Sequence, residues 1–73
     1  MATTVSAHIT GTVWKIEVAV GDQVSEGQTL IILESMKMEM PLEAPSPGRV
    51  KAILVREGAA VEEGAALIEL EGG

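Results

Sequence analysis

The second half of this chain repeats the first half at a fixed offset of 37 residues. Residues 11–34 and 48–71 align without a gap, and twelve of the twenty-four aligned positions are identical. Most of the identical residues are glycines and aliphatic residues: Gly11/Gly48, Val13/Val50, Ile16/Ile53, Val18/Val55, Gly21/Gly58, Val24/Val61, Glu26/Glu63, Gly27/Gly64, Leu30/Leu67, Ile31/Ile68, Leu33/Leu70 and Glu34/Glu71. Two copies are too few for a solenoid, which needs several units to bury its faces. The repeat therefore predicts two halves that close on each other around a pseudo-two-fold axis.

Each half shows the patterns of short strands. Residues 12–20 come close to apolar/polar alternation, which is typical of a half-buried strand. Residues 50–55 and 66–70 are short, aliphatic and bounded by glycine, and no window of a dozen residues has a clean helical stripe. Six of the eight glycines fall in matched pairs, which indicates equivalent turns with special backbone angles. The predicted fold class is all-β, a flattened β-barrel or two-sheet sandwich.

The repeat also predicts the core. The turn segments 21–27 and 58–64 each contain one valine, Val24 or Val61, that we expect to plug the interior. The full set of core candidates is Val13, Val18, Val24, Leu30, Val50, Ile53, Val55, Val61, Leu67 and Leu70. Trp14 lies by alternation on the face opposite Val13, so we expect it to be partly exposed, in packing or a surface contact.

Size and charge narrow the function classes. Seventy-three residues allow one domain and leave no room for a cleft between lobes. The chain has no cysteine, so neither a disulfide nor a thiolate metal site is expected, and a net charge of -6 disfavours nucleic acid and membrane as partners. The first residues do not form a signal peptide, and the longest apolar run, residues 30–33, is too short to span a bilayer. We expect a cytoplasmic protein.

The most unusual segment is residues 34–40, Glu-Ser-Met-Lys-Met-Glu-Met, which contains three of the four methionines. Residues 30–34 and 39–42 are predicted strands, which places residues 35–38 at an exposed hairpin tip. Methionine is adaptable and recurs at recognition surfaces, and at a tip it gains little from burial. Lys37 is therefore predicted to be displayed for recognition by another protein.

The repeat places this lysine at one end of the molecule. Adding 37 to Lys37 gives position 74, one residue beyond the end of the chain. The position equivalent to Lys37 is therefore where the termini should lie. We expect Lys37 to project from one end of the barrel and both termini to lie near the other.

Residues 34–40 resemble the attachment motif of the biotinyl domains, the biotin carboxyl carrier modules of biotin-dependent carboxylases. The resemblance covers nearly the whole chain, including the Gly-Asp-Gln-Val turn at residues 21–24 and the Pro-Ser-Pro-Gly link at residues 45–48. It implies a flattened barrel, the barrel-sandwich hybrid, of two four-stranded sheets with quasi-two-fold symmetry. The whole chain, residues 1–73, would be a single biotinyl domain.

By position in the motif, the resemblance implies that Lys37 is the biotinylated residue. Met36 and Met38 would be the flanks that biotin protein ligase reads, and Glu34 and Ser35 would complete the motif. Covalent biotin on Lys37 would carry a carboxyl group from biotin carboxylase to carboxyltransferase, with acetyl-CoA carboxylase as the favoured parent system. The carrier itself would perform no catalysis.

Two features depart from many family members. The halves align without a gap, so there is no room for the extra protruding thumb loop that some members carry in the first half. The chain also lacks the N-terminal assembly region and the Pro/Ala-rich linker of many carrier subunits. We expect a thumbless, stand-alone carrier rather than an excised domain.

Three alternatives stay open at this point. Lipoyl domains share the barrel and the hairpin lysine but typically lack methionine on both sides of it, so a lipoyl or dual biotin/lipoyl carrier is the first alternative. An unmodified scaffold that has kept the hairpin is the second. An enzyme is the third, and the sequence disfavours it because the only histidine, His8, has no nucleophile partner or ligand cluster near it in the chain.

Overall fold

The computed structural model describes residues 2–72, and these residues form eight strands and no helix. The strands are β1 (Ala2–Ser6), β2 (Gly11–Ile16), β3 (Gln23–Val24), β4 (Thr29–Ser35), β5 (Met38–Glu43), β6 (Gly48–Ile53), β7 (Ala60–Val61) and β8 (Ala66–Glu71). Residues 2–72 include no helix with the length and apolar character needed to cross a membrane. The all-β fold class predicted from the sequence is confirmed.

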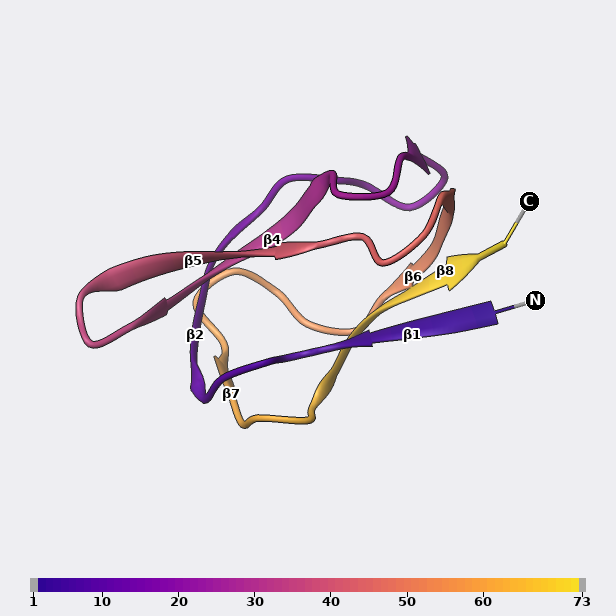
Figure 1. Cartoon of the computed structure of the whole chain (residues 1–73). Coiled ribbons are helices and arrows are strands. Elements are labelled where there is room, and N and C mark those ends of the chain that lie inside the picture. Colours follow the sequence, from indigo (N-terminus) through magenta and orange to yellow (C-terminus); the bar gives the residue numbers. More distant parts are fainter. Residues whose placement is uncertain (1, 73) are drawn as a thin grey trace.

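The strands form two antiparallel four-stranded sheets that lie against each other (Figure 1). Sheet A has the order β1-β8-β6-β3 and sheet B has the order β5-β4-β2-β7. Every strand of sheet A is related to a strand of sheet B by the offset of 37 residues, and the strand orders correspond. The molecule is elongated, 35 × 17 × 17 Å. The flattened barrel with quasi-two-fold symmetry is therefore confirmed.

A loop from each half of the repeat forms a backbone hydrogen bond with a strand of the other half. The backbone N–H of Gly21 donates to the carbonyl of Val50 at 2.8 Å, and the N–H of Gly58 donates to the carbonyl of Val13 at 2.7 Å. Both glycines have positive φ, 97° and 90°, a backbone conformation that residues with a Cβ avoid. The matched glycines therefore fix equivalent turns, as their pairing in the sequence predicts.

The core lies between the sheets and contains most of the predicted residues. Val13, Val18, Val24, Leu30, Val50, Val61, Leu67 and Leu70 are buried, and Ile53 and Val55 pack partly buried against them. The prediction missed seven further core residues: Val5, Ala7, Ile31, Leu33, Leu42, Ala44 and Ile68. Two of the missed residues, Ile31 and Ile68, are explained by a departure from strict alternation.

That departure is a β-bulge at the same place in each half. The register of β4 against β5 shifts between Thr29 and Ile31, so Leu30 is passed over and both Leu30 and Ile31 are buried. The equivalent bulge in β8 passes over Leu67 and buries both Leu67 and Ile68. A bulge places two residues opposite one, so neighbours can share a face. Alternation alone assigns only one member of each pair to the core.

The two ends of the barrel differ as expected. Ala2 of β1 pairs with Glu71 of β8, so the described ends of the chain lie side by side. The turn between β4 and β5 lies at the opposite end of the molecule (Figure 1). The predicted separation is confirmed for the described ends of the chain, which lie opposite the turn that contains Lys37.

Candidate functional site

Lys37 lies in a two-residue turn at the tip of the β4–β5 hairpin. Ser35 pairs with Met38 as the last register position, so only Met36 and Lys37 form the loop. Their φ angles are 55° and 63°. Positive φ at both central residues is the signature of a type I′ turn, whose twist matches the twist of antiparallel strands. The predicted hairpin is confirmed, with Ser35 and Met38 belonging to the strands.

The turn is built from residue types that do not favour it. Type I′ turns prefer Asn-Gly or Gly-Gly, because glycine has no Cβ and asparagine tolerates the left-handed region, whereas other side chains cost about 1–2 kcal/mol per residue there. Met36 and Lys37 both carry long side chains in this region. The paired strands β4 and β5 hold the turn in place despite that cost. Strain of this kind concentrates where function requires particular side chains.

The side chains around the turn face solvent. The exposed fractions are 90% for Met36 and 60% for Met38, and Lys37 is exposed as well. Large apolar side chains left in water contribute nothing to folding by burial, and methionine adapts readily to a partner surface. The two methionines beside Lys37 are therefore available for recognition by another protein.

The rest of the seven-residue segment divides into two groups. Glu34 and Glu39 are exposed and lie directly opposite each other in the register, and Ser35 is half-buried. Met40 is half-buried and lies opposite Leu33, a core residue, in the register. The pairing of Glu39 with Glu34 was not predicted, because only the strand register reveals it.

The sequence predicts no side chain that could act as a general base to deprotonate the Lys37 amine. The only histidine, His8, lies outside the hairpin. His8 is exposed in the loop between β1 and β2. Within residues 2–72 there is no group of three or more His, Cys, Asp or Glu side chains that could hold a metal ion. What the hairpin offers chemically is a primary amine at the end of a flexible stem, presented at a tip that can enter another protein's active site.

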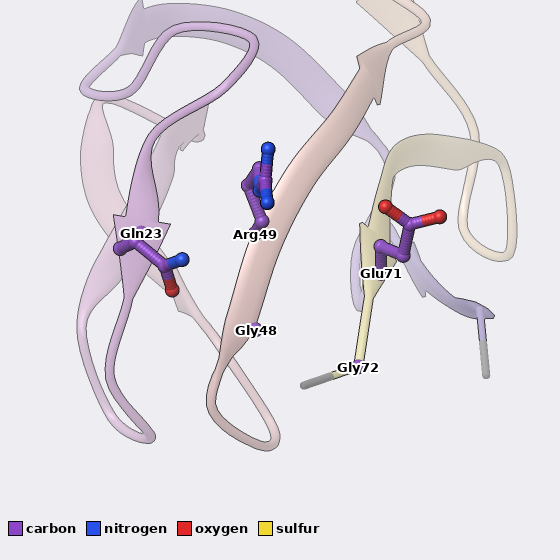
Figure 2. A pocket seen from close by; sticks show the side chains of 5 residues that line it. All are labelled: Gln23, Gly48, Arg49, Glu71 and Gly72. Carbon is purple, nitrogen blue, oxygen red and sulfur yellow. The ribbon is translucent and has the colours of Figure 1, made fainter.

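A pocket of about 140 Å³ lies away from the hairpin. Its lining includes Gln23, Arg49 and Glu71 from three neighbouring strands of sheet A, with Gly48 and Gly72 completing it (Figure 2). Gln23, Arg49 and Glu71 lie opposite one another in the strand register, and Glu71 also faces Ala2. The pocket therefore lies near the described ends of the chain, whereas the β4–β5 turn lies at the other end of the molecule (Figure 1). The pocket is therefore not part of the Lys37 site.

The donor chemistry at the tip fits a carboxylic acid cofactor. A free, exposed amine can form an amide with a carboxylic acid such as biotin, and such an amide needs no enclosing cavity on the protein that bears it. The turn exposes Lys37 beyond the last strand pair, so an attached group would extend into solvent. The residues present therefore fit covalent attachment.

Comparison with known proteins places the chain in a family. The family model described as "Biotin-requiring enzyme" matches residues 1–70. The biotin/lipoyl attachment protein of Bacillus subtilis is 49% identical over 67 residues, which cover 92% of each chain. The biotin carboxyl carrier protein of Streptococcus mutans is 48% identical over 69 residues, which cover 94% of this chain and 53% of that one.

A solved structure agrees with these relatives. The crystal structure of Kluyveromyces lactis urea carboxylase contains a region that superposes with a TM-score of 0.92 at 38% identity. The match covers 97% of this chain and 6% of the carboxylase chain. This chain thus corresponds to about half of the Streptococcus mutans protein and to a small part of the carboxylase. By its family match, its close relatives and its fold, the chain belongs to the biotin-requiring enzyme family, as a biotinyl domain.

Proposed function

We propose that this chain is a biotin carboxyl carrier in which biotin is attached to Lys37. The observation that carries this proposal is the exposed Lys37 amine in a two-residue turn at the end of the barrel opposite the chain's ends. Attached biotin supplies a ring nitrogen that accepts a carboxyl group at one active site and releases it at another. Residues 1–73 would form one such domain, with the repeat 11–34 and 48–71 as its two halves.

Attachment follows from the chemistry of the Lys37 amine. A biotin protein ligase presents the biotin carboxyl group activated as an acyl-adenylate. The Nζ atom of Lys37 attacks the acyl carbon, an amide bond forms, AMP leaves with the electrons of the broken bond, and the amine gives up a proton to the ligase or solvent. In this proposal Met36 and Met38 contact the ligase, and Glu34 and Ser35 position the turn and complete the recognised motif.

The barrel contributes position rather than catalysis. The hairpin is held by six register pairs between β4 and β5, so the attachment point is fixed relative to the body of the domain. A partner that holds the domain near its termini leaves the Lys37 end free to reach successive active sites. Tethering of this kind raises the effective concentration of the carried group and prevents its diffusion between sites. The proposed role is therefore that of a non-catalytic carrier.

The proposed partners are biotin protein ligase, biotin carboxylase and carboxyltransferase. The expected parent system is acetyl-CoA carboxylase, and an assay of the purified partners against acetyl-CoA and other acceptors would identify the acceptor. A net charge of -6 argues against nucleic acid and anionic membrane as partners. The cytoplasmic location expected from the sequence stays a prediction, which cell fractionation tests.

Transfer of a labelled carboxyl group tests the carrier function. The protein is biotinylated, incubated with a biotin carboxylase, ATP and ¹⁴C-bicarbonate, and separated from small molecules. We expect label on the biotinylated wild type and none on a Lys37→Arg variant treated in the same way. Label on neither protein, when a known carrier becomes labelled in parallel, would contradict the carboxyl carrier function.

A dual biotin/lipoyl carrier is the second candidate. The observation that favours it is the 49% identity to a protein named for attachment of both cofactors. Incubation with a lipoyl ligase, lipoate and ATP would then add one lipoyl group to the wild type and none to Lys37→Arg. An unmodified wild type, with a lipoyl domain modified in parallel, would remove this candidate.

A further inference from the structure

The two sheets share their core but not their outer faces. The offset of 37 residues relates each strand of sheet A to a strand of sheet B, so every outward position on one sheet has a counterpart on the other. The buried counterparts are often identical, such as Leu33/Leu70 and Val13/Val50. Among the exposed counterparts, Glu34/Glu71 is identical, but several others differ in kind. A difference confined to the outer face is not required by the fold and points to a function of that face.

At three outward positions sheet B carries an apolar side chain where sheet A carries a polar one, and at one position, Lys15/Ala52, the order is reversed. Lys15, Ile32 and Pro41 form one register row across β2, β4 and β5. Trp14 is the residue passed over by the bulge beside this row, and its exposed fraction is 46%. Ile32 is half-buried and Pro41 is exposed. The counterparts of Trp14, Ile32 and Pro41 on sheet A are Lys51, Glu69 and Thr4.

Between this apolar row and the Lys37 turn lies a row of acidic groups. Glu34 faces Thr12 on one side and Glu39 on the other, so two exposed carboxylates stand directly opposite each other. Like charges at such positions are destabilising. The equivalent row on sheet A pairs Glu71 with Arg49, which is the favourable arrangement. Sheet B therefore places like charges opposite each other where sheet A places unlike charges, and a basic partner would reduce the repulsion between Glu34 and Glu39.

The position of this face selects its occupant. Trp14, Ile32 and Pro41 lie on the strands that carry or adjoin the hairpin, so a protein that holds the Lys37 tip has this face beside it. An enzyme that works on attached biotin meets a group at the end of a long arm. The enzyme that attaches biotin has to bring its active site within one lysine side chain of the turn. The ligase is therefore the partner whose body must come closest to sheet B.

We propose that the outer face of sheet B is the docking surface for biotin protein ligase. The surface runs from Trp14 through Ile32 and Pro41 to the Glu34–Glu39 pair, and it matches an apolar depression on the ligase with a rim of lysine or arginine. The proposal rests on the proposed attachment of biotin to Lys37. It goes further in assigning recognition to Trp14, Ile32 and Pro41, which lie outside the motif of residues 34–40.

Matched substitutions at the two equivalent bulges test whether the apolar side chains of the proposed surface contact the ligase. Trp14→Gln removes the indole from sheet B, and Lys51→Gln makes the same replacement at the counterpart position on sheet A. Initial rates of biotinylation by purified ligase are measured against carrier concentration. We expect Trp14→Gln to lower kcat/KM about tenfold through a higher KM with kcat within about twofold, as loss of one anchoring side chain would do. Lys51→Gln is expected to stay within about twofold of wild type.

The same assay separates failure of this inference from failure of the proposed function. If the wild type accepts no biotin, the attachment proposal itself is wrong. If the wild type is biotinylated and folded Trp14→Gln has the same KM as wild type, only the docking surface is wrong. Should Trp14→Gln unfold, Ile32→Thr provides the same test at a half-buried position, and an unchanged KM for it would equally overturn the proposal.

A measurement without substitution on the surface gives an independent test. Trp14 is the only tryptophan in the chain, so 5-fluorotryptophan labels this position alone. In a Lys37→Arg carrier, which cannot be modified, we expect the ¹⁹F resonance to shift when ligase is added to saturation. An unchanged resonance, with the methyl signal of ¹³C-labelled Met36 shifted by the same ligase, would show that only the hairpin is held.

Two further measurements complete the test. Glu39→Gln removes one of the opposed carboxylates, and we expect it to lower kcat/KM and to weaken its dependence on NaCl, whereas Glu69→Gln on sheet A leaves both unchanged. An identical salt dependence in Glu39→Gln and wild type would refute the electrostatic part. Sedimentation of the free protein should show a monomer at assay concentrations. A dimer that Trp14→Gln dissociates would show that a second copy covers this face, and the ligase proposal would fall.

Discussion

Ser35 of β4 lies directly opposite Met38 of β5, and this pair closes the hairpin around a loop of only two residues. Two residues are the shortest of the common hairpin loops between antiparallel strands. The backbone of Lys37 is therefore held close to the last strand pair. The consequence is that Lys37 is fixed in place by the barrel, and only its side chain is free to move. Tight placement of an attachment point is what a recognising enzyme can exploit.

The first prediction concerns the cost of that turn. Replacing Met36 with Asn substitutes a residue that tolerates the left-handed region for one that does not. We expect the free energy of unfolding to rise by about 1 kcal/mol and the melting temperature to rise by about 4–8 °C, while biotinylation slows because the methionine is gone. Thermal denaturation followed by circular dichroism measures the change. A melting temperature at or below that of wild type would contradict the assignment of strain to Met36.

A second prediction concerns the two buried valines of the matched turns, Val24 and Val61. Val24 is 5% exposed, so Val24→Asp buries a carboxylate without a partner and should largely unfold the domain. Val61→Asp, at the equivalent position, should do the same because Val61 is 7% exposed. The control is Val20→Asp, since Val20 is 62% exposed and a charge there meets water. A folded Val24→Asp protein with the wild-type melting temperature would remove Val24 from the core.

A third prediction concerns the close approach of two backbone segments. A Cβ atom built on Gly11 would lie 2.5 Å from the carbonyl oxygen of Glu34, and one on Gly48 would lie 2.8 Å from the carbonyl oxygen of Glu71. Because these neighbouring atoms belong to the backbone, they cannot move aside to make room for a Cβ as the end of a flexible side chain could. Gly11→Ala and Gly48→Ala should therefore each lower the free energy of unfolding by about 1–3 kcal/mol. Thr12→Ala, at the exposed next residue of β2, serves as the control, and equal stability of all three variants would refute the steric explanation.

The repeat in the sequence accounts for most of what could be predicted about the fold. Pairs such as Gly21/Gly58 and Val24/Val61 recur at one offset, and the two sheets are related by the same offset in space. A sequence repeat of this kind constrains topology more strongly than local propensity does, because both copies must satisfy the same environment. The burial of Ile31 and Ile68 escaped prediction because bulges interrupt the alternation of faces. Nothing in the local residue pattern signals where a bulge begins.

The hairpin around Lys37 was also predictable, but its details were not. Strand-like residues on both sides of a short polar and methionine-rich segment indicate a tip. The two-residue loop was harder to foresee because Met-Lys lacks the Asn-Gly signature of a type I′ turn. The facing carboxylates of Glu34 and Glu39 depend on which residues lie opposite each other, and that register is a tertiary property. A single sequence does not display it.

A fourth prediction concerns charge. Biotinylation converts the Lys37 ammonium group into a neutral amide, so the formal net charge of -6 becomes -7 after loss of one positive charge. The modified protein should migrate faster toward the anode in a native gel than the unmodified protein. Lys37→Arg retains its charge and should show no shift under the same treatment. An unshifted wild-type band after incubation with an active ligase would count against modification of Lys37.

The central claim is that Lys37 is the single attachment point for biotin. Its most direct test is the intact mass of the folded protein after incubation with biotin, ATP and a biotin protein ligase, beside a Lys37→Arg control. We predict that the wild type gains the mass of one biotinyl group and that the control gains none. A wild type that stays unmodified by a ligase active on another acceptor, or a control that is modified equally, would contradict the account.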